Sequence, residues 1–130
     1  MSYCHEVRVR YVDCDMQGVV YNAHYLTFID DAFDCWLREI DMNFEEKFGS
    51  EVMLKQASIV WESPVKFSET LDIECKIIRW GNTSFDGFFV GSVNSRKTFE
   101  ATVTYVCVDH VNYGPIKIPT FLKEHLQRKA

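Results

Sequence analysis

The chain has 130 residues and a formal net charge of −5; 47% of its residues are hydrophobic and 15% are aromatic. This length fits a single domain over residues 1–130, and the acidic balance excludes a typical nucleic-acid-binding protein, which carries a basic patch. The high aromatic share leaves two interpretations open: an aromatic-rich core, or a second apolar surface that forms an oligomer interface or a ligand pocket.

The cysteines and histidines lack the spacing of a disulfide framework or a metal site. The 5 cysteines are odd in number, widely spaced and without a C-x-x-C pair, which favours free thiols in a reducing compartment. The first residues contain no apolar run of a signal peptide, and no segment approaches the roughly 20 apolar residues of a membrane span. We therefore expect a cytoplasmic protein that binds no metal and no nucleic acid and has no membrane span.

The amino-terminal part predicts a strand followed by a loop. Residues 5–12 alternate apolar and charged side chains, which is typical of a strand with one buried face. Residues 13–22 break this alternation, and Gly18 marks a turn within them.

The next segment predicts one long amphipathic helix. Asn22 fits its N-cap, because a side-chain oxygen there can accept a hydrogen bond from an unpaired amide of the first turn. From that point the apolar side chains recur with the helical period in a broad stripe, which indicates deep burial. The stripe consists of Tyr25, Phe28, Ile29, Ala32, Phe33, Trp36, Leu37 and Ile40. A shorter helical turn is predicted over residues 44–48, closed by Gly49.

The remaining sequence predicts four strands and a short terminal helix. Ala57, Ile59 and Trp61 share one face of the first strand, and Pro64 marks a bulge or an edge. Further strands are predicted over 71–80, 83–93 and 98–108, with turns at 81–82 and 94–97 and a short helix over 119–129. Because short turns join antiparallel strands, these elements predict an α+β fold in which a five-stranded antiparallel sheet wraps around one long helix.

Three segments carry a resemblance to a known family. Residues 11–30, YVDCDMQGVVYNAHYLTFID, resemble the pattern D-x-D-x-x-G-x-V-x-[NHY]-x-x-Y with an acidic residue five positions later. Residues 63–71 (SPVKFSETL) and 80–85 (WGNTSF) resemble the family segments R-P-x-x-F-G-D-x-L and x-G-x-x-S-[FL]. The chain thus resembles, over nearly its whole length, the 4-hydroxybenzoyl-CoA thioesterase family, in the branch close to the bacterial acyl-CoA thioesterases of the Tol-Pal cluster.

The resemblance implies a hot-dog fold, a homodimer or homotetramer, and hydrolysis of an acyl-CoA thioester to free acid and CoA without a cofactor. Two departures from the family pattern affect only details of the cleft. Ser63 stands where the family has Arg or Tyr, and Ser68-Glu69 replaces the common Gly-Asp.

The resemblance places Asp15 at the centre of catalysis. Its carboxylate would attack the thioester carbonyl or deprotonate a water that attacks it; a purely turn-forming role is the alternative. Asp13 is expected to shape the loop or to pair with a basic residue. The backbone amide of Asn22 is expected to hold the developing oxyanion, aided by the helix dipole, while the Asn22 side chain either caps the helix or contacts the thioester.

Substrate contacts are expected from the same segment. Gly18 would permit a backbone geometry, or a close ligand approach, that a side chain would block. Val19, Tyr21 and Tyr25 complete the expected substrate-binding set, although the position of Tyr25 on the apolar stripe also fits core packing.

Other chemistries fit the sequence less well. The G-x-S-x-G motif of α/β-hydrolases is missing, and the aspartates beside Cys14 disfavour its thiolate. Arg79, Arg96 and Lys97 are candidates for binding the phosphates of CoA. Two alternatives to hydrolysis remain open: a hot-dog hydratase or dehydratase, which pairs a histidine with a carboxylate, and a non-catalytic acyl-CoA-binding protein.

Overall fold

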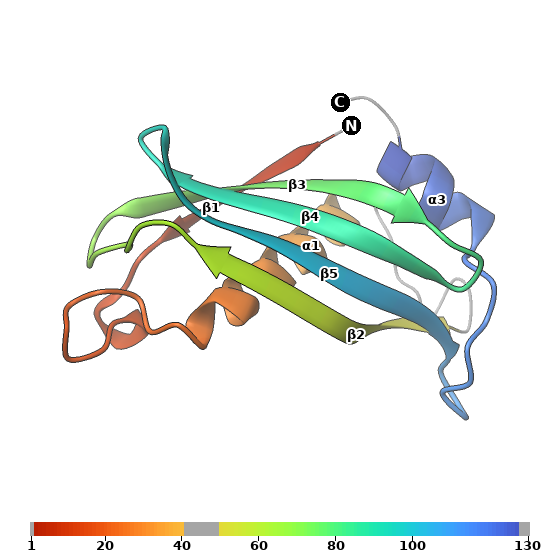
Figure 1. Cartoon of the computed structure of the whole chain (residues 1–130). Coiled ribbons are helices and arrows are strands. Elements are labelled where there is room, and N and C mark those ends of the chain that lie inside the picture. Colours follow the sequence, from red (N-terminus) through yellow and green to blue (C-terminus); the bar gives the residue numbers. More distant parts are fainter. Residues whose placement is uncertain (1, 41–49, 128–130) are drawn as a thin grey trace.

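A curved antiparallel sheet and one long helix make up most of the protein (Figure 1). The computed structural model describes residues 2–40 and 50–127. The elements in chain order are β1 (Tyr3–Arg8), a 3-10 turn (Tyr11–Asp13), α1 (His24–Glu39), β2 (Ser50–Trp61), β3 (Thr70–Trp80), β4 (Ser84–Val93), β5 (Arg96–Asp109) and α3 (Thr120–Gln127). The predicted turn over residues 44–48 lies outside the described residues.

The five strands lie in the order β1-β3-β4-β5-β2, and every neighbouring pair is antiparallel. The number and orientation of the strands confirm the predicted sheet. A two-residue turn joins β4 to β5, and its residues Asn94 and Ser95 have φ of 48° and 68°, as a tight hairpin turn requires.

The expectation that short turns join the later strands fails at one link, because β2 and β3 follow each other in the chain but are not neighbours in the sheet. β2 pairs with β5 at one edge, whereas β3 lies beside β1 in the opposite half of the sheet. The segment 62–69 therefore crosses the end of the sheet. Its last residues are bound to the end of β1, because Val9 N donates to Glu69 O at 2.9 Å and Ser68 N donates to Val9 O at 3.1 Å.

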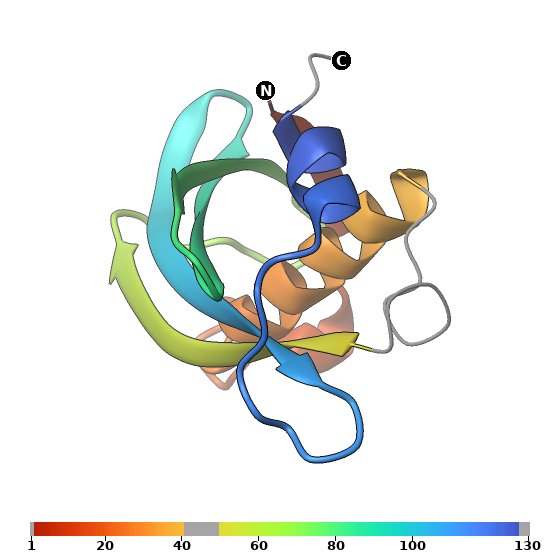
Figure 2. The ribbon, with the colours of Figure 1, turned by 90° about the vertical axis from the view of Figure 1, so that its right-hand side faces the viewer.

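The long helix lies in the concave face of the sheet (Figure 2). The buried face of α1 consists of Tyr25, Phe28, Ile29, Ala32, Phe33 and Trp36, which confirms the predicted stripe. Aromatic contacts join the helix to β5: Phe33 stacks on Tyr105 with ring centroids 4.4 Å apart, and Tyr25 meets Phe99 at 5.3 Å. Burial of each such side chain contributes about 1.5–3 kcal/mol to folding, so this layer fixes the position of α1.

Two strand boundaries differ from the predictions. β1 ends at Arg8 instead of residue 12, because Asp13 turns the chain back: its carboxylate accepts from Arg10 N at 2.8 Å. β2 begins at Ser50 rather than near residue 57, because it pairs with β5 as far as Asp109. The predicted terminal helix is confirmed by α3. Among the described helices, none is long and apolar enough to cross a membrane.

Candidate active site

The loop between β1 and α1 contains a tight reverse turn. Asp15 N donates to Val19 O at 2.9 Å, and Gly18 N donates to Asp15 O at 3.0 Å. Gly18 has φ of +78°, a region that residues with a Cβ atom rarely adopt. A Cβ at this position would meet no atom within 4 Å, so backbone conformation, not crowding by the chain itself, explains the glycine.

The turn is anchored on the segment that follows β2. Val20 N donates to Val65 O at 2.8 Å, and Val19 forms a β-bridge with Lys66. Val20 and Val65 are both buried. The loop is therefore fixed against the core on the side of the crossing segment.

The Asp15 side chain combines a turn-forming contact with a free oxygen. Its Oδ1 accepts from Gln17 N at 2.8 Å, a local contact that is typical of aspartate in turns. In the described part of the chain, no group donates to Oδ2. The side chain is partly buried, so this oxygen is available to a bound molecule.

A pocket of about 390 Å³ opens beside Asp15. It is lined by Asp15, Gln17, Val19, Val20, Tyr21, Asn22, Tyr25, Trp61, Glu62, Ser63 and Pro64. Five of the six predicted site residues are therefore brought together. The sixth, Gly18, lies in an adjacent hollow that Asp15 also lines, together with Tyr11 and Phe67.

One wall of the pocket could not be predicted from the sequence. Trp61 is 48% exposed, and its ring meets that of Tyr25 edge to face at 5.9 Å. A large exposed aromatic surface beside a pocket is suited to an apolar ligand. The sequence placed Trp61 on a strand face but gave no signal of the pocket, because the crossing segment after β2 brings this wall to the loop.

Two backbone amides just before α1 find no backbone acceptor among the described residues. Tyr21 N donates to Asp13 O at 3.0 Å and His24 N donates to Tyr21 O at 2.9 Å, whereas no described carbonyl accepts from the amides of Asn22 and Ala23. Open amides at a helix start can bind an anion.

The prediction that Asn22 caps α1 is wrong. Ala23 occupies the N-cap position, and no side chain accepts a capping hydrogen bond. The turn from Tyr21 to His24 displaces Asn22 one position outside the helix. Its side chain has no hydrogen-bond partner within the residues described, and Asn22 lines the pocket.

Known proteins resemble the chain over most of its length. The model of the Thioesterase-like superfamily matches residues 9–126. The acyl-CoA thioester hydrolase YbgC of Escherichia coli is 31% identical over 117 residues, which are 87% of this chain and 87% of that protein. The chain belongs to the thioesterase-like superfamily.

Solved thioesterase structures share the fold. A 4-hydroxybenzoyl-CoA thioesterase variant, in complex with 4-hydroxybenzoyl-CoA, matches with a TM-score of 0.89 at 18% identity and covers 96% of this chain and 98% of that one. The 1,4-dihydroxy-2-naphthoyl-CoA thioesterase Slr0204 from Synechocystis matches with a TM-score of 0.88 at 19% identity over 97% and 96% of the two chains. The predicted family and the hot-dog fold are confirmed.

In this thioesterase-like protein the first aspartate of the motif is a structural group. Asp13 is 4% exposed, and its carboxylate contacts the Arg10 guanidinium at 3.1 Å and the Arg10 amide at 2.8 Å. Burial alone raises the pKa of the Asp13 carboxyl, but the hydrogen bonds from Arg10 outweigh burial and hold this pKa below its ordinary value. The expected loop-shaping role of Asp13 fits these contacts.

The two tyrosines of the predicted substrate-binding set differ in environment. Tyr25 is 2% exposed, and burial raises the pKa of its hydroxyl, so it packs in the core and also borders the pocket. Tyr21 is 47% exposed and meets the His24 ring edge to face at 5.6 Å. Of these two tyrosines, Tyr21 is therefore the one whose exposed side chain can contact a ligand.

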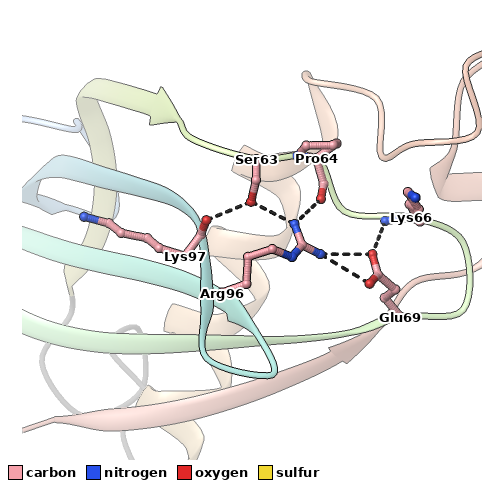
Figure 3. Close-up of polar contacts among 6 residues, drawn as sticks. All are labelled: Ser63, Pro64, Lys66, Glu69, Arg96 and Lys97. Atoms are coloured by element: carbon pink, nitrogen blue, oxygen red, sulfur yellow. Dashed lines mark hydrogen bonds and ion pairs between the residues drawn. The ribbon is translucent and has the colours of Figure 1, made fainter.

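Arg96 joins the pocket wall to the β4–β5 hairpin (Figure 3). Its Nη1 donates to Ser63 Oγ and to Pro64 O, both at 2.8 Å, and its Nη2 donates to the two Glu69 oxygens at 3.4 and 3.3 Å. Ser63 Oγ in turn donates to Lys97 O at 2.8 Å. This network fixes the crossing segment at the point where Ser63 and Pro64 line the pocket.

The cations that were candidates for CoA phosphates all have partners inside the chain. Arg79 Nε lies 2.7 Å from Asp86 Oδ2. Lys97 Nζ lies 3.0 Å from Glu62 and 2.7 Å from Glu100. With Arg96 held by the pocket wall, these three side chains serve intramolecular contacts.

Proposed function

We propose that the chain hydrolyses an acyl-CoA thioester to a free acid and CoA, with Asp15 as the catalytic carboxylate. The observation that carries the proposal is the pocket beside Asp15. It combines a carboxylate with an open Oδ2 and a helix start at which the amides of Asn22 and Ala23 have no backbone acceptor in residues 2–40 and 50–127. The names of relatives such as YbgC, an acyl-CoA thioester hydrolase, support the same substrate class.

The chemistry follows from these two groups. In the general-base route, Asp15 Oδ2 takes a proton from a water as that water attacks the thioester carbonyl. In the nucleophilic route, Oδ2 itself attacks, CoA leaves as a thiolate, and water then hydrolyses the acyl anhydride. In both routes the carbonyl oxygen becomes negative, and the open amides at the start of α1 stabilise it, helped by the helix dipole. Neither route requires a metal or an organic cofactor.

The apolar walls of the pocket suit the acyl group. Val19, Tyr21 and Tyr25 come from the loop and α1, and Trp61 and Pro64 come from the end of β2 and the crossing segment. A volume of about 390 Å³ is at the lower end of small-ligand pockets. A thiol-release assay over a panel of aryl, branched and medium-chain thioesters of CoA and of acyl carrier protein identifies the substrate.

The two alternatives make different predictions in that assay. A hydratase or dehydratase needs a histidine beside the carboxylate, but within the described chain no histidine lines the pocket. A non-catalytic binding protein would bind acyl-CoA and release no thiol from any member of the panel. Thiol release that disappears in Asp15→Asn supports hydrolysis by this site; saturable binding without release supports the binding protein.

We further propose a homodimer or homotetramer. β2 is an edge strand of 12 residues, and an open edge of this length is usually paired or covered. Exposed apolar side chains follow it: Met53, Leu54, Val60 and Trp61 are 44%, 40%, 54% and 48% exposed. Light scattering at micromolar concentration checks this proposal, and a monomer would contradict it.

A further inference from the structure

A second group of reactive side chains lies between β1 and α1, away from the pocket residues. His5 is on β1, the edge strand opposite β2, and Asp31 and Cys35 are one turn apart on α1. The ligand atoms of these three residues all lie within 4.8 Å of one another. His5 Nε2 and Asp31 Oδ2 are 3.2 Å apart.

The spacing of these atoms suits a transition-metal ion. Zinc binds histidine nitrogen, carboxylate oxygen and thiolate sulfur at about 2.0–2.3 Å, which places ligand atoms of a tetrahedral site about 3.4–3.6 Å apart. The 3.2 Å between His5 Nε2 and Asp31 Oδ2 is already close to that value. Because no pair of ligand atoms is more than 4.8 Å apart, the Cys35 sulfur needs to approach the other two by at most roughly 1.4 Å, which a rotamer adjustment supplies. Two ligands at i and i+4 on a helix, with a third from another element, leave the fourth position to water.

The electrostatics favour a bound cation over a catalytic thiol. Burial, followed by the Asp31 and Asp34 carboxylates, raises the pKa of the Cys35 thiol against the opposing effect of Arg38, which is ion-paired with Asp34; the raised pKa disfavours a nucleophilic cysteine. The same negative surroundings attract a divalent ion, and a coordinated thiol loses its proton to solvent.

We propose that His5, Asp31 and Cys35 form a binding site for a divalent transition-metal ion, with zinc as the ion that this donor set fits best. The ion would tie β1 to α1. These are the two elements that flank the loop carrying Asp15, so the site stabilises the frame of the active site and takes no part in the reaction. The sequence gives no signal of this group, because 26 residues separate His5 from Asp31.

Cobalt(II) and zinc titrations of the reduced, chelator-treated protein test the proposal. We expect one equivalent of Co²⁺ to give a near-ultraviolet thiolate-to-cobalt absorption band that Zn²⁺ abolishes. Cys35→Ser should remove the band, and Asp31→Asn should weaken binding about 10-fold or more. Cys4→Ser is the matched control, because Cys4 precedes His5 on β1 and is exposed; it should bind as the unmodified chain does.

Thermal unfolding provides the second readout. Zinc at about a hundredfold excess over its dissociation constant should raise the midpoint by roughly 10 °C in the unmodified chain and in Cys4→Ser, but not in Cys35→Ser. The absence of a thiolate band, or equal loss in Cys4→Ser and Cys35→Ser, would overturn the site. Thiol release should persist after chelation below the unfolding temperature, which separates this test from that of Asp15.

Discussion

Replacement of Arg96 by methionine should weaken both the fold and substrate binding. The change keeps an apolar stem but removes two hydrogen bonds of 2.8 Å, to Ser63 and Pro64, and the ion pair with Glu69. A hydrogen bond from a charged donor contributes about 1.5–3 kcal/mol when buried. Because the Arg96 side chain is 43% exposed, we discount these bonds and give the ion pair less than about 1 kcal/mol. The total loss should be about 1–2 kcal/mol.

The kinetic effect separates this role from general stability. Ser63 and Pro64 line the pocket, so Arg96→Met should raise KM several-fold for acyl-CoA while kcat changes little, as expected when a substrate contact shared by ground and transition states is loosened. Arg79→Met is the matched control: Arg79 is 45% exposed and forms a 2.7 Å ion pair with Asp86, but neither residue lines the pocket.

Urea unfolding and steady-state thiol release measure the two effects. We expect both variants to lose stability and only Arg96→Met to raise KM. Equal changes of KM in Arg96→Met and Arg79→Met would refute the positioning role of the network. An unchanged KM in a destabilised Arg96→Met protein would also refute the positioning role of the Arg96 network.

Three further substitutions probe the start of α1, the packing of β4 on β5, and the Asp13–Arg10 pair. Asn22→Ala should alter the free energy of unfolding by less than about 0.5 kcal/mol, because the Asn22 side chain does not cap the helix, and it should lower kcat. Unchanged turnover would show that Asn22 contributes to catalysis only through its backbone amide. Gly91→Ala should cost about 1–3 kcal/mol in urea unfolding, because its Cβ would overlap the buried Phe99 ring; a wild-type midpoint would contradict this packing. Asp13→Asn should lower the free energy of unfolding at neutral pH, because the hydrogen bonds from Arg10 hold the folded-state pKa of Asp13 below its ordinary value. The stability that this pair contributes disappears as the pH falls through that folded-state pKa, so the variant should lose less stability than the unmodified chain below about pH 4. An unchanged acid unfolding profile would contradict the pairing.

The sequence predicted the features that depend on local pattern. The apolar period along α1 identified the helix face that is buried, and strict alternation identified the sheet strands. The motif brought Asp15 and Asn22 to one pocket, because both belong to a single loop whose turn is determined by Gly18.

Contacts between residues far apart in the sequence could not be predicted from local pattern. Strand alternation does not say that β2 pairs with β5, and Trp61 reaches the pocket only through that pairing and the crossing segment. The N-cap was misplaced because a further turn, closed by His24 N and Tyr21 O, precedes the helix. Two departures from the family pattern, at Ser63 and at Ser68-Glu69, provide contacts for Arg96 through Ser63 and Glu69. The sequence gives no sign that these separate positions meet at one side chain.

The turnover of Asp15→Asn decides whether Asp15 is the catalytic carboxylate. This change retains the size of the side chain and an oxygen that can accept from Gln17 N, so fold, oligomeric state and acyl-CoA binding should stay as in the unmodified chain. Removal of the base or nucleophile should lower thiol release from the best substrate by about 10²-fold or more. Asp13→Asn should retain more activity than Asp15→Asn and lose more stability. A folded Asp15→Asn protein that binds acyl-CoA and hydrolyses it at close to the unmodified rate would contradict the assignment.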